Sequence, residues 1–488
     1  MTGVSERAFL CPTYKTKEGL FVKKLRSNAT DMTSGSPYRL LFLFTAPLLL
    51  GNVFQQLYNM VDSIVVGNFI GEKALAAVGT GFPITFMMSS LFMGLSTGAT
   101  IMISQYYGAR DIGQVTATVN TIYTAMMVGI IPLTIIGVLC SRPLLLMMNV
   151  PDDGTLEMAD TYMVVIFIGM IGTLGFNINA GILQGLGDSR TSLLFLSIAA
   201  VINTVLDLAF TFCGMGVFGV AFATIIAQIA SWLFGVYFIN RHYTFLHIRL
   251  FKIQFQRSLF KRAIQLGIPS GIQQALFAVG IMAMQALVNS YGSTFTAGFN
   301  GANKIDTFVF LPIQSMSSAV TTYVGQNVGA ARMERVQRGT RAGLILCVVA
   351  SLVISVVVYP LSAVLMRMFS QSPDVIEAGV YYLHALLPFY FLCAILFILS
   401  AVLRGAGSMI VPMAASLLSL WLARVPIAYW IAGVWGKEFI YYSYPISWAI
   451  GILIVLVAYF HGGWKKKAIV APTNREEQPA DHLSPSAS

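Results

Sequence analysis

The chain has 488 residues, of which 56% are hydrophobic and only 10% are charged, and its mean hydropathy is +0.74. This composition is too apolar for an ordinary soluble globular protein. It excludes water-soluble enzymes and binding modules and indicates a polytopic membrane protein.

Apolar runs of about 20 residues or more recur along the whole chain, and each is long enough for a helix that crosses a bilayer. Barrel strands do not describe them, because such strands alternate polar and apolar residues over about ten positions. The fold class is therefore all-α, with twelve predicted transmembrane helices at approximately 40–66, 74–107, 114–140, 158–186, 191–213, 217–240, 259–290, 295–328, 340–366, 378–403, 409–434 and 440–462.

The two terminal segments, outside the predicted helices, are polar. Residues 1–36 are basic without helical periodicity or the arrangement of a signal peptide, so we expect a cytoplasmic extension, in which Met32 offers an alternative start. Residues 465–488, rich in Pro, Ser and Glu, predict a disordered cytoplasmic tail.

The first predicted helix carries a polar stripe within an apolar run. Its members fall at helical spacing and so share one face: Asn52, Gln55, Gln56, Asn59 and Asp62. A carboxylate in the middle of a membrane costs at least about 2.5 to 3.5 kcal/mol, so this face should meet a water-filled cavity or another helix. Asp62 is the first candidate functional residue, although it could also snorkel to the helix end.

The net charge of +10 reflects topology. With the N-terminus in the cytoplasm, 24 of the 30 Lys and Arg fall in cytoplasmic segments, which is the positive-inside bias. We expect both termini in the cytoplasm, a plasma (inner) membrane location, the anionic inner leaflet as a lipid partner and no nucleic-acid partner. The five isolated cysteines indicate no disulfide framework or zinc site.

The two halves of the sequence repeat each other in the same order. Pro47 pairs with Pro269, SQYYGA with GQNVGA, and LQGLGDS with LRGAGSM, and the remaining pairs are Glu157 with Glu377 and Tyr162 with Tyr382. Six predicted helices per half give both halves the same direction in the membrane, as in transporters that rock about a site between two lobes. We predict an N-terminal lobe at 37–240, a cytoplasmic linker at 241–258 and a C-terminal lobe at 259–464.

Polar stripes inside other N-terminal helices could complete a site with Asp62. Asn203 and Asp207 are four residues apart, and Thr224 begins a series with Gln228 and Ser231. Two carboxylates with amide and hydroxyl oxygens can hold protons or a hard cation such as Na⁺. We therefore predict a cation-coupling site, with possible Na⁺ binding, at Asp62, Asn203, Asp207 and Thr224.

Further polar residues within the predicted helices are candidates for a substrate cavity. They are Gln55, Gln56, Asn59, Asn177, Gln184, Gln274, Asn300, Asn303, Asp306 and Arg424. Asp306 could instead pair with Lys304, and Arg424 could balance a carboxylate or line the interface between lobes. His384 is more often a hydrogen-bonded core histidine than a proton carrier.

The runs LYNMVDSIVVGNFIGEKALAAVG and NTVLDLAFTFCGMGVFGVAFAT, together with the two glycine-rich motifs, resemble the multidrug and toxic compound extrusion (MATE) transporters over about residues 37–464. The chain is more similar to their DinF-like branch than to the NorM branch. The resemblance implies twelve helices in two parallel lobes and a cation site in the first lobe, where Asp62, Asn203, Asp207 and Thr224 stand at the matching positions.

These observations favour a secondary antiporter that exports lipophilic, often cationic small molecules as H⁺ or Na⁺ enters, by alternating access. Without an ATP-binding motif GxxxxGK[ST], energy must come from an ion gradient, so we expect no cofactor beyond the coupling ion, and a monomer.

The alternative is a flippase for a lipid-linked saccharide. A flippase should line its cavity with several cations, and Lys304 and Arg424 are the only basic residues away from the ends of the predicted helices. An enzyme is disfavoured, because no HExxH or other catalytic constellation falls inside them.

Overall fold

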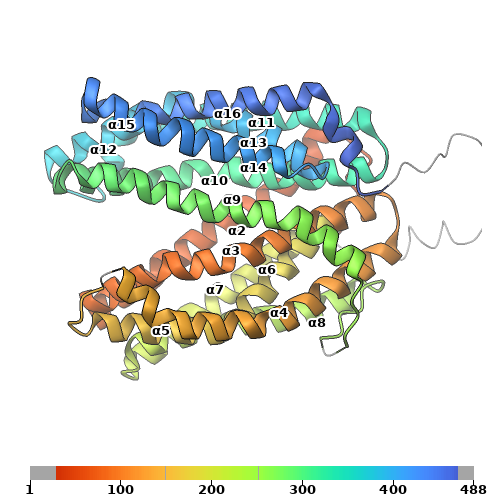
Figure 1. The fold of residues 1–488 in the computed structure, drawn as a ribbon, viewed down its shortest axis with the longest axis horizontal. Coiled ribbons are helices and arrows are strands. Elements are labelled where there is room, and N and C mark those ends of the chain that lie inside the picture. Colours follow the sequence, from red (N-terminus) through yellow and green to blue (C-terminus); the bar gives the residue numbers. More distant parts are fainter. Residues whose placement is uncertain (1–28, 149, 251, 471–488) are drawn as a thin grey trace, which may run out of the picture.

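The computed structural model describes residues 29–148, 150–250 and 252–470, and within these ranges it is built of helices without strands. The helices form two bundles that lie side by side (Figure 1). The first bundle contains α2 (Pro37–Val65), α3 (Glu72–Gly108), α4 (Ile112–Met147), α5 (Thr155–Ile168), α6 (Met170–Gly185), α7 (Ser189–Phe212) and α8 (Gly216–His242), with a π-helical segment, η2 (Val66–Ile70), after α2.

The second bundle repeats this layout with more short segments. It contains α9 (Arg257–Asn289), α10 (Ser293–Gly329), α11 (Met333–Met366), α12 (Pro373–Leu386), α13 (Tyr390–Gly405), α14 (Ile410–Leu417), α15 (Val425–Val434) and α16 (Ser443–His461). Between and after them lie η3 (Leu387–Phe389), η4 (Leu418–Arg424), η5 (Lys437–Tyr442) and η6 (Gly463–Lys467).

The predicted membrane-spanning fold is confirmed. Among the described residues, 10 helices are long and apolar enough to cross a bilayer, or up to 11 when the bent pair α5 and α6 is taken as one span. The 37-residue α10 corresponds to the eighth predicted helix, 295–328, and brings the number of helices that match the prediction to twelve. Its lower apolarity has a simple origin, since it carries Asn300, Asn303, Lys304 and Asp306.

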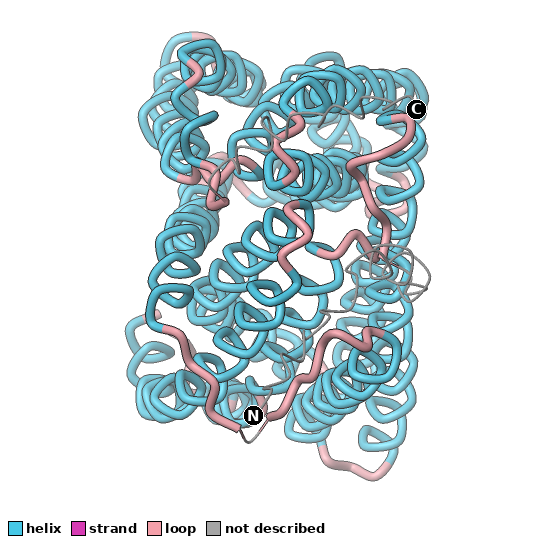
Figure 2. Tube along the Cα trace, turned by 90° about the vertical axis from the view of Figure 1, so that its right-hand side faces the viewer, coloured by secondary structure: helices cyan, strands magenta, loops and turns pink. Residues whose placement is uncertain are grey.

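Residues 29 and 470 lie at the same end of the molecule, which we call the terminal end (Figure 1, right). Here α3, α6, α10 and α13 end, and α2, α7 and α9 begin. Figure 2 looks onto this end and shows the helices of both bundles with the loops that join them. The ribbons of the two bundles diverge toward the opposite end, which we call the far end.

The fourth predicted span is a broken helix. α5 and α6 meet at an angle of 51°, and the break falls at Gly169. A Cβ atom on Gly169 would collide with Ile225 of α8, so the missing side chain lets the bend pack directly against that helix. The matching place in the second bundle is the short 3-10 segment η3, which contains Pro388.

At the terminal end, each hydrophobic core contains residues from the first helix of the other bundle. The core of the second bundle includes Leu41, Phe44 and Leu48 from the first half of α2. The core of the first bundle includes Leu259, Ala263 and Leu266 from the first half of α9. Each bundle therefore buries the opening turns of the helix that begins the other. The predicted lobe boundaries remain a prediction.

Glycines bring α3 and α9 into backbone contact where they cross. A Cβ atom on Gly94 would lie 2.7 Å from the backbone nitrogen of Gly271, and one on Gly98 would lie 2.6 Å from the carbonyl oxygen of Ala263. Small residues allow close packing of helices in membranes, where apolar side chains gain little by leaving lipid. This crossing fixes the first bundle to the opening half of α9.

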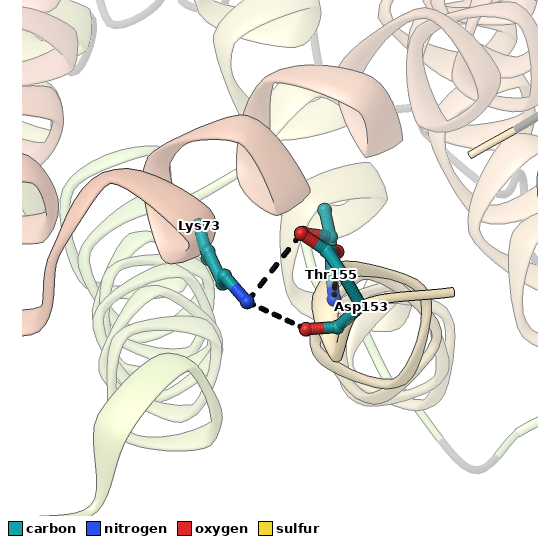
Figure 3. Close-up of polar contacts among 3 residues, drawn as sticks. All are labelled: Lys73, Asp153 and Thr155. Atoms are coloured by element: carbon teal, nitrogen blue, oxygen red, sulfur yellow. Dashed lines mark hydrogen bonds and ion pairs between the residues drawn. The ribbon is translucent and has the colours of Figure 1, made fainter. Parts of the chain in front are cut away.

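A polar contact fastens the start of α3 to the loop before α5 at the far end (Figure 3). Lys73 Nζ lies 3.4 Å from Asp153 Oδ2 and donates to the Asp153 carbonyl at 2.7 Å. The Thr155 backbone N–H donates to Asp153 Oδ1 at 3.2 Å. Hydrogen bonds from Thr155, followed by Lys73, lower the pKa of the Asp153 carboxyl. Because Lys73 and Asp153 are both about half exposed, the pair contributes little to stability.

Candidate functional site

The predicted cation-coupling residues come together inside the far half of the first bundle. Asp62 reaches inward from the last turns of α2, and Asp207 comes from the last turns of α7. Their carboxyl groups face each other directly. Asp207 is fully buried, at 0% exposure, and Asp62 is half-buried. The pair thus faces the interior of the bundle rather than lipid.

An amide and a hydroxyl complete the group. Asn203 lies one turn before Asp207 on α7, is 0% exposed, and donates from Nδ2 to the Thr224 hydroxyl of α8 at 3.2 Å. That hydroxyl donates its own proton to the Val220 carbonyl at 3.1 Å. The Thr224 hydroxyl therefore acts as an acceptor toward Asn203, and the carbonyl oxygen of Asn203 has no hydrogen-bond partner.

The site is rich in buried oxygens that accept no hydrogen bond. Among the described residues these include Asp62 Oδ1, Asn203 Oδ1 and both carboxylate oxygens of Asp207. Buried polar atoms are normally paired, and an unpaired one costs about 1 to 3 kcal/mol. A cluster of such acceptors is therefore a place where a bound cation or proton would relieve the cost.

Two tyrosines that were not predicted for this site also face the carboxyl groups of Asp62 and Asp207. Tyr58 lies one helical turn before Asp62, and its hydroxyl interacts with Asp62 and Thr224. Tyr162 of α5 lies near both carboxyl groups. Tyr58 could have been recognised from its spacing to Asp62, because residues four apart share a helix face. Tyr162 is brought in only by packing.

This donor set suits a small monovalent cation or a proton. Two carboxylates, one amide oxygen and one hydroxyl are hard oxygen ligands of the kind that Na⁺ accepts, and a carboxyl pair can also share one proton. Among the residues described, no cluster of three or more His, Cys, Asp or Glu could hold a metal ion. The cation chemistry available here therefore depends on neutral oxygens as well as on the acid pair.

The polar stripe on α2 divides between two environments. Asn52 donates from Nδ2 to the Ser315 hydroxyl of α10 at 2.9 Å, so this part of the stripe joins the two bundles. Gln55 and Asn59 are exposed and Gln56 is half-buried. The place of these three residues in a substrate cavity remains a prediction.

The other residues predicted to line a cavity are spread over both bundles. Asn177 donates to the carbonyl of Thr173 in its own helix at 2.7 Å. Asn300 is exposed on α10. The half-buried members of this set are Asn177, Gln184, Gln274 and Asn303. The structure gathers none of them into a compact cluster, and their role in substrate binding remains a prediction.

Asp306 has a different environment from the acid pair. It accepts a hydrogen bond from the Tyr390 hydroxyl of α13, and Tyr382 and Arg424 lie near it. The described ion pairs are Lys73 with Asp153 and Arg338 with Glu334, so the alternative of a Lys304–Asp306 pair is not formed. Tyr382 is the repeat partner of Tyr162, and each tyrosine therefore faces a buried acid in its own bundle.

Arg424 and His384 are held by neighbours within the second bundle. Arg424 is 7% exposed, donates from Nε to Ser447 Oγ at 3.1 Å, and lies 4.2 Å above the ring of Tyr444. The imidazole of His384 lies 2.9 Å from Ser362 Oγ and stacks on Tyr359. His384 is thus a hydrogen-bonded histidine, and the cavity role of Arg424 remains a prediction.

Comparison with known proteins agrees with this architecture. The MatE family profile matches residues 47–209 and 269–430, once in each bundle. The probable multidrug resistance protein YpnP of Bacillus subtilis is 31% identical over 441 residues, which cover 90% of this chain and 98% of that protein.

Solved structures show the same fold. The crystal structure of MATE in complex with MaL6 superposes with a TM-score of 0.84 at 23% identity, covering 90% of this chain and 99% of that one. A multidrug resistance MATE transporter in an outward-facing conformation gives a TM-score of 0.81 at 22% identity, with the same coverage. The repeated family match, the full-length relative and the doubled six-span bundles lead to one conclusion: this chain belongs to the MATE family of membrane transporters and is not an enzyme.

Proposed function

We propose that the protein is a secondary antiporter that exports lipophilic, often cationic small molecules in exchange for H⁺ or Na⁺ by alternating access. The observation that carries this proposal is the Asp62–Asp207 pair, with its unpaired buried oxygens, in one bundle only. The relative YpnP is named as a probable multidrug resistance protein, which supports the substrate class. The proposed branch is the DinF-like one, because the proposed cation site is in the first bundle.

Coupling requires that the ion and the substrate favour different states of the transporter. An ion that bound both states with equal affinity would not shift the equilibrium between them. In the proposed cycle, Asp62 and Asp207 bind the entering cation while the far end is open, and Asn203 and Thr224 orient it. Neutralised acids would then tolerate closer packing of α2 and α7, which changes the wall that α2 presents to the substrate.

The electrical balance fits a one-for-one exchange. Moving one positive charge outward against an inside-negative potential costs about 2.3 kcal/mol per 100 mV, and one entering H⁺ or Na⁺ offsets that cost. The chemical gradient of the ion then drives export of a monovalent cationic drug.

The positive-inside bias supports a plasma membrane protein with its terminal end in the cytoplasm. On this orientation, the far end opens to the outside. The flippase alternative gains no support from the second bundle, because Arg424 is occupied by Ser447 and Tyr444 and Lys304 is left as an isolated exposed cation. A pyrophosphate group requires several such cations in one place.

Dye efflux from proteoliposomes tests the proposal, with pH and Na⁺ gradients imposed separately. Efflux that follows one of these gradients, and that is lost in both Asp62→Asn and Asp207→Asn, is the expected result. Full gradient-driven transport by both variants would reject the assignment of the coupling site.

A further inference from the structure

Two glutamines that are equivalent in the sequence repeat connect the bundles at the terminal end. Gln105, near the end of α3, donates from Nε2 to the Gly405 carbonyl at the end of α13 at 2.9 Å. Gln326, near the end of α10, donates to the Gly185 carbonyl at the end of α6 at 3.3 Å. Both glutamines are 0% exposed. Each contact therefore crosses from one bundle to the other.

The helices that carry these glutamines touch through glycine. A Cβ atom on Gly108 would collide with the carbonyl oxygen of Gln326, and one on Gly329 would collide with that of Gln105. The last turns of α3 and α10 thus meet as a near-symmetric pair. The SQYYGA and GQNVGA motifs supply both the glycines and the glutamines of this contact.

The segment before α2 adds a strap across the contact. We call residues 29–33 the N-terminal strap. The Met32 N–H donates to Gln326 Oε1 at 2.9 Å, and the Met32 carbonyl accepts from Asn327 Nδ2 at 3.1 Å and from Arg335 at 3.2 Å. The Thr33 carbonyl accepts from Arg332 at 2.5 Å. A segment that leads into the first bundle is thereby tied to the second.

The segment after α16 makes the reciprocal connection. We call residues 467–470 the C-terminal strap. The Ile469 N–H donates to Gln105 Oε1 at 2.7 Å, and its carbonyl accepts from Arg262 at 2.7 Å. Ile469 and Val470 pack against the core of the first bundle, while Met32 is a fully buried member of the core of the second. The two straps thus cross over.

We propose that Gln105 and Gln326 are the gate residues at the terminal end, and that each holds one strap to close that end during transport. This inference rests on the alternating-access cycle proposed above. In such a cycle the terminal ends of α3 and α10 must separate before the transporter can open toward that side. The Gln105–Gly405 and Gln326–Gly185 hydrogen bonds and the glycine contacts of α3 with α10 join the two bundles, so these contacts must break in that step.

The geometry makes the gate cooperative. The side-chain amide of each glutamine donates to the opposite bundle and accepts from a strap, so loss of either bond frees the amide for water and weakens the other. Arg332 and Arg335 both bind the N-terminal strap, whereas Arg262 binds the C-terminal strap. Their neighbour Arg338 is exposed and bonds only Glu334 of its own helix, and it provides a matched control.

The test measures the gate directly, without transport. Spin labels at Arg241→Cys of α8 and Arg341→Cys of α11, both exposed near the terminal end, report the distance between bundles in an otherwise cysteine-free full-length protein. We expect the double variant Gln105→Leu/Gln326→Leu to raise the ratio of open to closed molecules by roughly tenfold. Arg332→Ala/Arg335→Ala should raise it in the same direction, and Arg338→Ala should leave it unchanged.

Each outcome decides the proposal. If neither the glutamine pair nor the arginine pair changes the distance distribution, or if Arg338→Ala changes it equally, the gate assignment is wrong. The arginine variant keeps the test valid if the buried glutamine variant does not fold. The distance measurement is independent of efflux, so failure of ion-driven transport in the unmodified protein would overturn the proposed function and leave this result standing.

Discussion

The carboxyl groups of Asp62 and Asp207 face each other inside the first bundle, yet one oxygen of Asp62 and both oxygens of Asp207 accept no hydrogen bond. Asp306 in the second bundle is bonded by Tyr390 and lies near Arg424. The two bundles thus handle a buried acid in opposite ways. One leaves its acids unsatisfied, and the other satisfies its acid with protein groups.

The first prediction concerns the unsatisfied pair. Asp62→Asn and Asp207→Asn should each abolish gradient-driven efflux, because an amide cannot take up a proton and holds a cation weakly. Protein yield and the thermal unfolding midpoint in detergent should stay close to those of the parent. Asp153→Asn, at an exposed acid of the far end, is the control and should transport normally.

The tyrosine beside the pair gives the second prediction. Tyr58→Phe removes a hydroxyl that interacts with Asp62 and Thr224, and loss of one hydrogen bond to a charged group should reduce the apparent affinity for the coupling ion roughly tenfold. The ion concentration for half-maximal efflux measures this change. Tyr237→Phe on α8, which is 67% exposed, should leave it unaltered, and equal effects of both variants would argue against a specific role for Tyr58.

A third prediction separates Asp306 from coupling. Asp306→Asn should destabilise the second bundle by about 1 to 3 kcal/mol, because Tyr390 and Arg424 would lose a buried charged partner. The ion dependence of efflux by the remaining folded protein should not change. A shifted ion dependence with unaltered thermal stability would instead place Asp306 in the transport pathway.

The glycine crossing of α3 and α9 gives the fourth prediction. Gly94→Ala places a methyl group against the backbone of Gly267 and Gly271, and overpacking of this kind costs about 1 to 3 kcal/mol. The unfolding midpoint should fall accordingly. Gly79→Ala lies on the same helix with no atom near the added carbon, so it should be neutral or slightly stabilising.

A fifth prediction concerns alkaline pH at the terminal end. The Tyr243 hydroxyl donates to Asp188 Oδ2 at 2.5 Å, and burial, followed by the Asp188 charge, raises the pKa of Tyr243. A raised pKa in the folded state stabilises the protein at neutral pH, and this contribution is lost as the pH rises through values above about 10.

Tyr243→Phe should therefore lower stability by about 1 to 3 kcal/mol at pH 7 and flatten the loss of stability above pH 10. Thermal unfolding between pH 7 and 11 measures both effects. Tyr38→Phe, at an exposed tyrosine near the same end, should show neither. An alkaline profile that is unchanged in Tyr243→Phe would contradict the assignment.

Much of the architecture follows from the sequence because a bilayer leaves few choices. An apolar run must become a helix to satisfy its backbone, so the predicted spans fall within a few residues of the observed helices, which generally extend by a turn or less. The two longest extensions are equal: α4 continues past Pro143 to Met147, and α11 begins already at Met333. The bend at Gly169 was not predicted, because it depends on how closely Ile225 approaches.

The site was predictable only where one helix supplied the pattern. Asn203 and Asp207 share a helix face by their spacing alone, and an acidic residue inside an apolar run can be recognised from the sequence as a candidate functional residue. The contribution of Tyr162 could not be predicted in this way, since Tyr162 lies far in the sequence from Asp62 and comes near the two acids only in the folded bundle. Residues 29–33 were expected to be a plain polar extension, and their contacts with Gln326 and Asn327 lie far away in the sequence.

The crossed straps also constrain how the protein is made. Met32 is among the first described residues to emerge from the ribosome, but the core that buries it is synthesised last, and the first bundle waits for Ile469 and Val470 to cover its own surface. The earlier half must therefore persist in the membrane with an uncovered patch until translation ends. Closure of the terminal end therefore cannot precede synthesis of the second bundle.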